Sequence, residues 1–331
     1  MNVYINGIGI ISRCAYGAEE LTAIAFGQIP QIHQLPLDFP TEISSSKLRR
    51  SSRYNKLACA VADQALKSAG IPEMMELEGL DGHRIGTILS TGYGAAEYSS
   101  VFADSVVKGD PNLCSPLLFS GSVPNSCVGQ ICIINRLKGF STVLAGGDPL
   151  EYASLLISTG RADHILAGSV EEYFPALYKA FYKLDAAKGT DLSEGAAMAV
   201  LSGQKTEKTW CKVSAFGSTN LGRSPLLDRQ EDPVRTERMI IDVIRQMNAP
   251  DTVFTAANGS WFDEIENRAI KSVFPDIAQH CPKDLFGETL GCGYMMNVLL
   301  AAASVRSGIC SRPLVTGIDM IGNYICVMLE K

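Results

Sequence analysis

Apolar residues recur along this chain with two different periods, which predicts strands and helices in turn. Residues 3–11 (VYINGIGII) form a β-branched run typical of a buried strand, whereas residues 51–70 combine a helical period with a terminal glycine. Residues 15–50 contain three prolines and are expected to be irregular. Further strands are expected at residues 84–91, 141–145, 196–201, 211–220, 252–257 and 323–329, and helices at residues 233–247, 262–273 and 295–305. This alternation predicts an α/β fold with helices on both faces of a sheet.

The pattern also contains an internal repeat. A glycine-rich turn followed by an apolar helix occurs at residues 143–160 and again at residues 286–308. The first strands of the two parts, at 3–11 and 211–217, are similar as well. We therefore expect two similar halves, residues 1–205 and 206–331, within one compact unit.

The turn between residues 141–145 and the following helix is the most informative local feature. A residue placed there lies at a helix N-terminus, where backbone N–H groups and the helix dipole stabilise an anionic nucleophile. The turn consists of Ala145, Gly146, Gly147 and Asp148, and contains no Cys, Ser or Lys. Nucleophilic catalysis from this turn is therefore not expected.

Composition narrows the possible partners. The net charge of −6 argues against nucleic acid or an anionic membrane as the main partner. The ten cysteines include no C-x-x-C pair and no zinc spacing, which favours reduced thiols in a cytoplasmic protein. Gly7 and Gly9 resemble the start of a dinucleotide-binding motif, but its third glycine is replaced by Ser12. We expect no bound metal or nucleotide, and no secretory leader before the strand that begins at residue 3.

Several segments, in this order, resemble the β-ketoacyl-ACP synthase branch of the thiolase-fold superfamily. The segments GQICIINRLKG and STGRADHILAGSVEE resemble those that bracket the family's nucleophile, and LSEGAAMAVL resembles its G-E-G-A-x-x-x-V-L motif. TAANGSWFDEIENRAI and KDLFGETLGCG resemble the segments that carry its two catalytic histidines. The resemblance implies a thiolase-like fold of two similar βαβαβ-type halves in a five-layered αβαβα arrangement.

The same resemblance identifies the positions where the family carries its catalytic groups. The nucleophilic Cys position falls on Gly146–Gly147, with Gly147 the nearer equivalent, and the two His positions fall on Asn258 and Glu288. All three groups are replaced, so the resemblance implies that this chain does not condense acyl groups alone.

Other residues of these motifs are candidates for the rim or the acyl tunnel. Lys283 matches the lysine of the second His motif, and Asp319 and Met320 fall in the family's gate loop. Cys292 is either a small packing residue or a substitute thiol. Residues 185–189 are expected at the rim.

Three functions are compatible with this pattern. The first is a chain-length-factor-like subunit of fatty acid or polyketide biosynthesis, which pairs with an active ketosynthase and shapes its tunnel. The second is a divergent enzyme that processes acyl-ACP through Asn258, Glu288 and Cys292, and the third is a scaffold without catalysis. The resemblance implies an acyl carrier protein, with its phosphopantetheine arm, as a further partner. It also implies a heterodimer or homodimer formed through residues 141–145.

Overall fold

The computed structural model describes residues 2–39, 43, 45–109, 114–184, 189–226 and 232–331. Ten strands form one sheet in the order β3-β2-β4-β5-β1-β6-β10-β9-β7-β8. The strands are β1 Val3–Ile11, β2 Ile85–Thr91, β3 Ser141–Ala145, β4 His164–Glu171, β5 Gly195–Ser202, β6 Cys211–Asn220, β7 Thr252–Phe254, β8 Ala278–His280, β9 Pro313–Ile318 and β10 Asn323–Glu330. The α-helices are α1 Gly17–Ala25, α2 Ser45–Leu48, α3 Arg53–Ala69, α4 Ile71–Leu77, α5 Ala96–Lys108, α6 Pro116–Ser122, α7 Ser126–Asn135, α8 Pro149–Ser158, α9 Pro175–Phe181, α10 Pro233–Ile244, α11 Phe262–Val273, α12 Lys283–Phe286 and α13 Gly293–Arg306.

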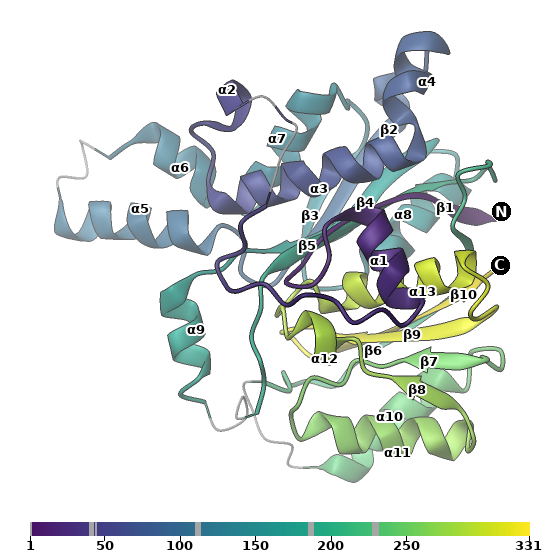
Figure 1. Ribbon diagram of the computed structural model, residues 1–331. Coiled ribbons are helices and arrows are strands. Elements are labelled where there is room, and N and C mark those ends of the chain that lie inside the picture. The colour runs from purple at the N-terminus through teal and green to yellow at the C-terminus, as the bar shows by residue number, and fades with distance from the viewer. Residues whose placement is uncertain (1, 40–42, 44, 110–113, 185–188, 227–231) are drawn as a thin grey trace.

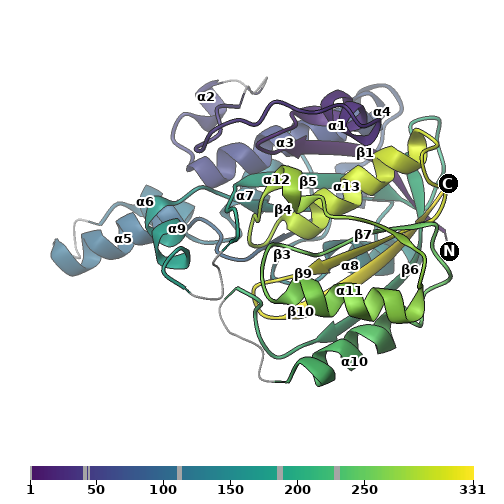
Figure 2. The ribbon, with the colours of Figure 1, turned by 60° about the horizontal axis from the view of Figure 1, so that its bottom comes forward.

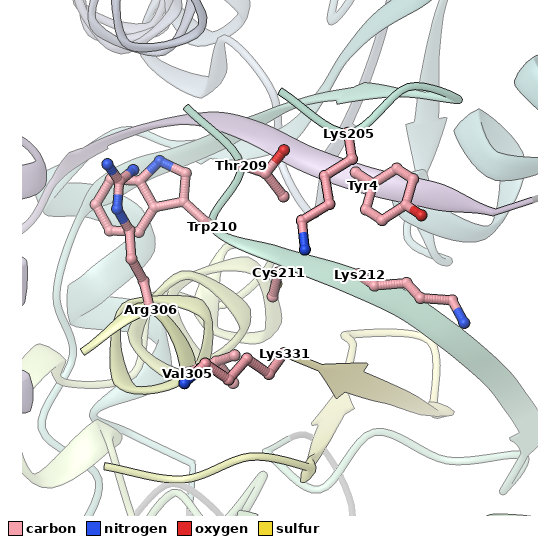
Figure 3. A pocket seen from close by; sticks show the side chains of 9 residues that line it. All are labelled: Tyr4, Lys205, Thr209, Trp210, Cys211, Lys212, Val305, Arg306 and Lys331. Carbon is pink, nitrogen blue, oxygen red and sulfur yellow. The ribbon is translucent and has the colours of Figure 1, made fainter. Parts of the chain in front are cut away.

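The topology of the first five strands is repeated by the last five. Outward from the centre, the strand order is β1-β5-β4-β2-β3 on one side and β6-β10-β9-β7-β8 on the other. The directions repeat too, with two antiparallel pairings followed by two parallel ones in each half. The two halves join where β1 pairs antiparallel with β6, and Tyr4 lies opposite Lys212 there, beside a surface hollow (Figure 3). The sheet thus repeats one topology in two parts, while the division at residues 205 and 206 stays a prediction.

The strands separate three apolar cores, which produce five layers. Along β5, Ala197, Ala199 and Leu201 face a middle core with α8 and α13, whereas the alternate residues face an outer core with α3 and α7. Strand β10 divides a middle from an outer core in the same way, and α10 and α11 cover that outer core. Figures 1 and 2 show this αβαβα arrangement from two directions, which confirms the expected fold class.

Glycines in β1 allow the long helix α3 to approach the sheet closely. A Cβ atom at Gly7 would lie 2.5 Å from the carbonyl oxygen of Ala65, and one at Gly9 would collide with that of Val61. The two glycines are therefore explained by helix packing rather than by phosphate binding.

The central helix α13 is buried along its length. All its residues except the terminal Arg306 are buried between the two halves, as its apolar sequence predicts. Helix α1 packs against α13 through Leu21 and Ile24, so the prediction that this segment is irregular was wrong. This segment has one apolar face, and it forms a helix because that face can pack against α13.

Helices α5 and α6 project from the body of the molecule and form what we call the helical arm (Figures 1 and 2). Within residues 96–108 and 116–122, no side chain is buried. Apolar residues are nevertheless exposed on it, among them Val107 (81% exposed) and Phe119 (57%). No single helix in the described part of the chain is long and apolar enough to cross a membrane. Among those residues, α6 and α7 together reach the required length and apolar composition, but they are bent by 97° relative to each other.

Candidate functional site

The turn between β3 and α8 is built from two glycines and a capping aspartate. Gly146 and Gly147 have φ angles of +79° and +85°, in the left-handed region that favours glycine. Asp148 caps α8 by accepting a hydrogen bond from the Leu150 N–H at 2.8 Å. The Gly146 N–H donates to the carbonyl of Thr91 at the end of β2, so the turn lies at the carboxyl ends of parallel strands.

A carboxylate occupies the space beside this turn. The Gly147 N–H donates to Asp319 Oδ2 at 2.8 Å, and a Cβ atom at Gly146 would collide with that oxygen. Asp319 is held in place by the backbone N–H of Ile321 (3.0 Å) and by the side-chain amide of Asn323 (2.7 Å). Asp319, which was predicted in the gate loop, therefore contacts the turn to which the family's nucleophile position was assigned.

Met320 follows Asp319 and lies beside the end of β2. A Cβ atom at Gly92 would lie 3.2 Å from Met320 Cγ. Met320 also packs on a small apolar cluster that includes Tyr178 and Leu290. The two predicted rim residues thus face different neighbours, one the glycine turn and the other an apolar cluster.

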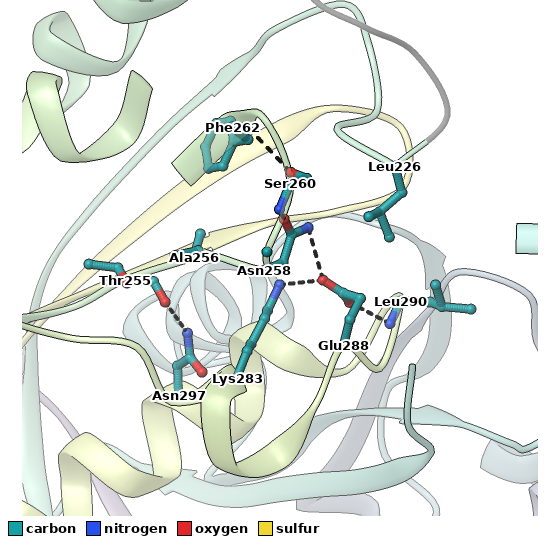
Figure 4. Close-up of polar contacts among 12 residues, drawn as sticks. Leu226, Thr255, Ala256, Asn258, Ser260, Phe262, Lys283, Glu288, Leu290 and Asn297 are labelled. Carbon is teal, nitrogen blue, oxygen red and sulfur yellow. Dashed lines mark hydrogen bonds and ion pairs between the residues drawn. The ribbon is translucent and has the colours of Figure 1, made fainter. Parts of the chain in front are cut away.

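Asn258, Lys283 and Glu288, which the motifs predicted at the site, meet in a second buried cluster (Figure 4). The Lys283 ammonium lies 2.6 Å from Glu288 Oε2, and the Asn258 side-chain amide donates to the same oxygen at 3.1 Å. Glu288 Oε1 accepts a hydrogen bond from the Leu290 N–H at 2.6 Å. The Lys283 and Glu288 side chains are only 4% and 3% exposed, so each charge is compensated by its partner in a dry environment.

The loop before β5 supports this cluster. The Ser193 N–H donates to the carbonyl of Glu288 at 2.8 Å, and the Glu288 N–H donates to that of Asp191. Residues 185–188, part of the segment predicted at the rim, lie outside the described residues.

Cys292 lies in the core rather than at a reactive surface. Its thiol is fully buried and donates to the carbonyl of Ser169 at 3.3 Å. Burial, and then the nearby Glu171 carboxyl, raise the pKa of the Cys292 thiol well above its ordinary value. The thiol is therefore protonated at neutral pH and is a poor nucleophile.

Glu171, which no sequence motif identified, lies beside the end of β2 and the turn that carries Glu288. At the end of β4, its carboxyl accepts hydrogen bonds from the Thr91 hydroxyl at 2.9 Å and from the Gly92 N–H. Complete burial raises the pKa of Glu171 to about 8. Gly291, in the turn that carries Glu288, has no room for a Cβ atom beside this carboxyl. A glutamate at the end of an apolar strand was the available signal.

Two further carboxyls, of the half-buried Asp148 and the buried Glu194, support the frame. Asp148 accepts from the Tyr294 hydroxyl at 2.9 Å, which connects α8 with α13, and burial raises the pKa of Asp148 to about 7. Glu194, in the segment LSEGAAMAVL, is fully buried and is paired with Arg53 at 2.5 Å. It also accepts from the Tyr173 N–H at 2.7 Å, so its contacts are structural.

Comparisons with known proteins agree with this architecture. The model of the β-ketoacyl synthase N-terminal domain matches residues 25–207, more than half of the chain. The structure is similar to the ishigamide ketosynthase/chain length factor, with a TM-score of 0.80 and 16% identity over 100% of this chain and 99% of that one. It is also similar to one chain of the AntDE:AntF complex, in which a type II polyketide synthase acyl-carrier protein is in complex with its ketosynthase bound to the hexaketide. The TM-score is 0.77, with 16% identity over 99% of each chain.

A third similar structure is a β-ketoacyl synthase from Burkholderia phymatum STM815. Its TM-score is 0.78, with 16% identity over 100% of this chain and 99% of that one. At such identities, structural similarity establishes the fold, whereas the family is established by the sequence match. This chain belongs to the β-ketoacyl synthase family and has its thiolase-like fold.

Proposed function

We propose that this protein is a non-condensing, chain-length-factor-like subunit that pairs with an active ketosynthase and helps to shape its acyl tunnel. The observation that carries the proposal is the turn before α8. It holds Gly146 and Gly147 at the position that the motif resemblance assigns to the family's thiolate, and Asp319 fills the space beside it. A glycine cannot accept an acyl group, so the bond-making step has to come from another subunit.

The second cluster supports the absence of decarboxylating chemistry. In the family, two His side chains stabilise the enolate that forms when malonyl-ACP loses CO2. Here the Asn258 amide and the Lys283 ammonium are directed to the Glu288 carboxylate. These donors are already engaged inside the protein, which makes them poor candidates for stabilising charge on a substrate.

The same geometry disfavours the divergent-enzyme alternative. Glu288 accepts three hydrogen bonds from the chain, and the Cys292 thiol is buried and protonated. Neither group is arranged as an accessible base or nucleophile.

Two surfaces support pairing with another subunit. Strand β3 is at the edge of the sheet and is only half-buried, so one row of its backbone groups is open. The helical arm exposes apolar side chains that its own chain does not cover. Similar structures include a ketosynthase/chain length factor and a ketosynthase with its acyl-carrier protein, and we extend both kinds of partner to this chain. The group delivered to the complex would be the phosphopantetheine arm of the carrier protein.

Co-expression with an active ketosynthase tests the proposal. We expect a stable heterodimer that extends an acyl chain on the carrier protein, with the acyl group on the ketosynthase Cys when the complex is analysed by mass spectrometry. The matched control is the heterodimer with that Cys replaced by Ala, which should be inactive. An acyl adduct or turnover on the present chain alone would support the divergent-enzyme alternative. A homodimer of this chain that does not bind the ketosynthase would support the scaffold alternative.

A further inference from the structure

A basic hollow lies at the end of the sheet opposite to the two clusters. Tyr4 in β1 and His164 in β4 both lie opposite Ser202 of β5, so these three residues mark one end of the sheet. Glu171 lies at the other end of β4. Seven residues of strand separate these ends, which corresponds to about 23 Å. The hollow near Tyr4 is therefore independent of the candidate site.

Cationic side chains from separate parts of the chain surround this hollow. They are Lys205 after β5, Lys212 in β6, Arg306 at the end of α13, and Lys331. In Figure 3, Lys205 extends over the hollow, with Arg306 and Lys212 on either side of it. The chain as a whole carries a net charge of −6, so this local excess of positive charge runs against its composition.

The negative groups nearby offset only part of this charge. Glu330 lies 3.6 Å from Lys212, and both side chains are about one-third exposed (30% and 31%). Such a partly exposed pair is weak and can rearrange around a ligand. Glu207, in the same linker as Lys205, is exposed.

Arg306 is held in place before any ligand binds. Its guanidinium carbon lies 4.4 Å from the centre of the Trp210 ring, and its Nη1 donates to the carbonyl of Lys208 at 3.2 Å. Trp210 itself is only 8% exposed, so this ring is a fixed platform. A guanidinium fixed in this way loses little freedom when it binds an oxyanion, and its planar fork matches the geometry of phosphate.

The shape of the hollow limits the size of the ligand. Its volume is about 170 Å³, and buried side chains of Trp210, Cys211 and Val305 form its wall. We propose that this hollow binds a phosphate group, as free phosphate or as the phosphomonoester of a small metabolite. Four cationic side chains against the paired Glu330 and the exposed Glu207 favour a dianion over a monoanionic carboxylate.

Titration with inorganic phosphate, phenyl phosphate and benzoate tests this site, at an ionic strength held constant with NaCl. Binding is followed calorimetrically in the wild type, in Lys205→Gln, in Lys205→Gln/Arg306→Gln, and in the control Lys271→Gln, which removes an exposed lysine on α11. We expect saturable phosphate binding that weakens at least about tenfold in the double variant and changes less than about twofold in the control. Benzoate should bind at least about tenfold more weakly than phenyl phosphate.

The outcomes separate the two sources of phosphate. Tighter binding of phenyl phosphate than of inorganic phosphate identifies a phosphomonoester, and the reverse order identifies free phosphate. The proposal is overturned if phosphate binding is not saturable, or if Lys205→Gln and the double variant both bind like the wild type. Lys205 is exposed, so its variant keeps the test valid even if loss of Arg306 weakens the fold.

Discussion

Lys283 and Glu288 form a buried ion pair that depends on both partners. Replacing Lys283 by Met leaves the Glu288 carboxylate uncompensated in a dry environment, and removal of one partner of such a pair costs about 3–5 kcal/mol. The double variant Lys283→Met/Glu288→Gln should recover most of this loss, because it removes both charges together and leaves one amide oxygen that can accept from the Leu290 N–H.

Urea unfolding of the single and double variants measures the free energies. The matched control is Lys108→Met, which breaks an exposed pair with Asp104 and should cost no more than about 1 kcal/mol. A Lys283→Met variant as stable as the wild type would show that Glu288 is not charged in the folded protein.

Glu171 makes the stability of the protein depend on pH. Its folded pKa is about 8, whereas an unfolded glutamate titrates near 4.3. Between these values the folded state holds a proton that the unfolded state has released, so the free energy of unfolding should fall as pH rises from about 5 to about 8. Asp148 and Glu172, whose pKa values burial raises to about 7, act in the same direction.

Denaturation at a series of pH values checks this dependence. The variant Glu171→Gln should show a shallower fall, and Thr91→Ser, which keeps both the carboxyl and its hydroxyl partner, should keep the wild-type slope. An unchanged slope in Glu171→Gln would mean that this carboxyl does not bind the proton.

At the residue scale, the sequence grouped residues correctly in space where a motif carried the information. The motifs identified Asn258, Lys283 and Glu288 as one site, and the structure brings them together. The contact between Gly147 and Asp319 joins residues 172 positions apart and depends on how two loops fold, which no local pattern encodes. Glu171 was missed because burial, rather than residue type, is what raises its pKa.

At the scale of elements, the helical arm is the surface with the clearest consequence for partners. Replacing Val107 and Phe119 by Ser should leave the stability of the isolated chain within about 0.5 kcal/mol, because both side chains are exposed. If the arm contacts a ketosynthase, the same change should weaken the heterodimer at least about tenfold.

The matched control for the arm is Val234→Ser on α10, which is 68% exposed on the opposite outer layer. Analytical ultracentrifugation of the co-expressed subunits measures the affinity. Equal weakening by the arm variant and the control would show that the arm is not part of the interface.

Most elements follow from the apolar pattern, and the exceptions have a physical reason. The strands at 3–11 and 141–145 and the helix at 262–273 were predicted with their observed bounds. Strands β8 and β9 were not predicted. Strand β8 has only three residues and lies at an edge, where half-exposed residues give a weak pattern. Strand β9 begins with Pro313 and contains Gly317, and both residue types weaken a strand pattern. Helix α1 was missed because its helical state depends on contact with α13.

At the scale of the whole molecule, the two halves share one middle layer. Helix α13 belongs to the second half but packs against β5 of the first half as well as against β9. Fragments 1–205 and 206–331 produced separately should therefore lack a cooperative thermal transition, because each exposes part of the middle core. Co-expressed fragments should associate and regain the transition. A soluble 206–331 fragment that unfolds cooperatively would contradict this dependence.

The strand repeat places the two clusters at corresponding turns of the two halves. The turn between β3 and α8 and the segment between β8 and α13 occupy corresponding places in the two halves. One turn holds two glycines beside a carboxylate, and the other contains a buried ion pair. A side chain introduced at Gly146 would collide with Asp319, and removal of either partner of the Lys283–Glu288 pair would leave an uncompensated buried charge. If the proposed function holds, no single substitution at these two turns would therefore supply condensation chemistry without a collision or a buried unpaired charge.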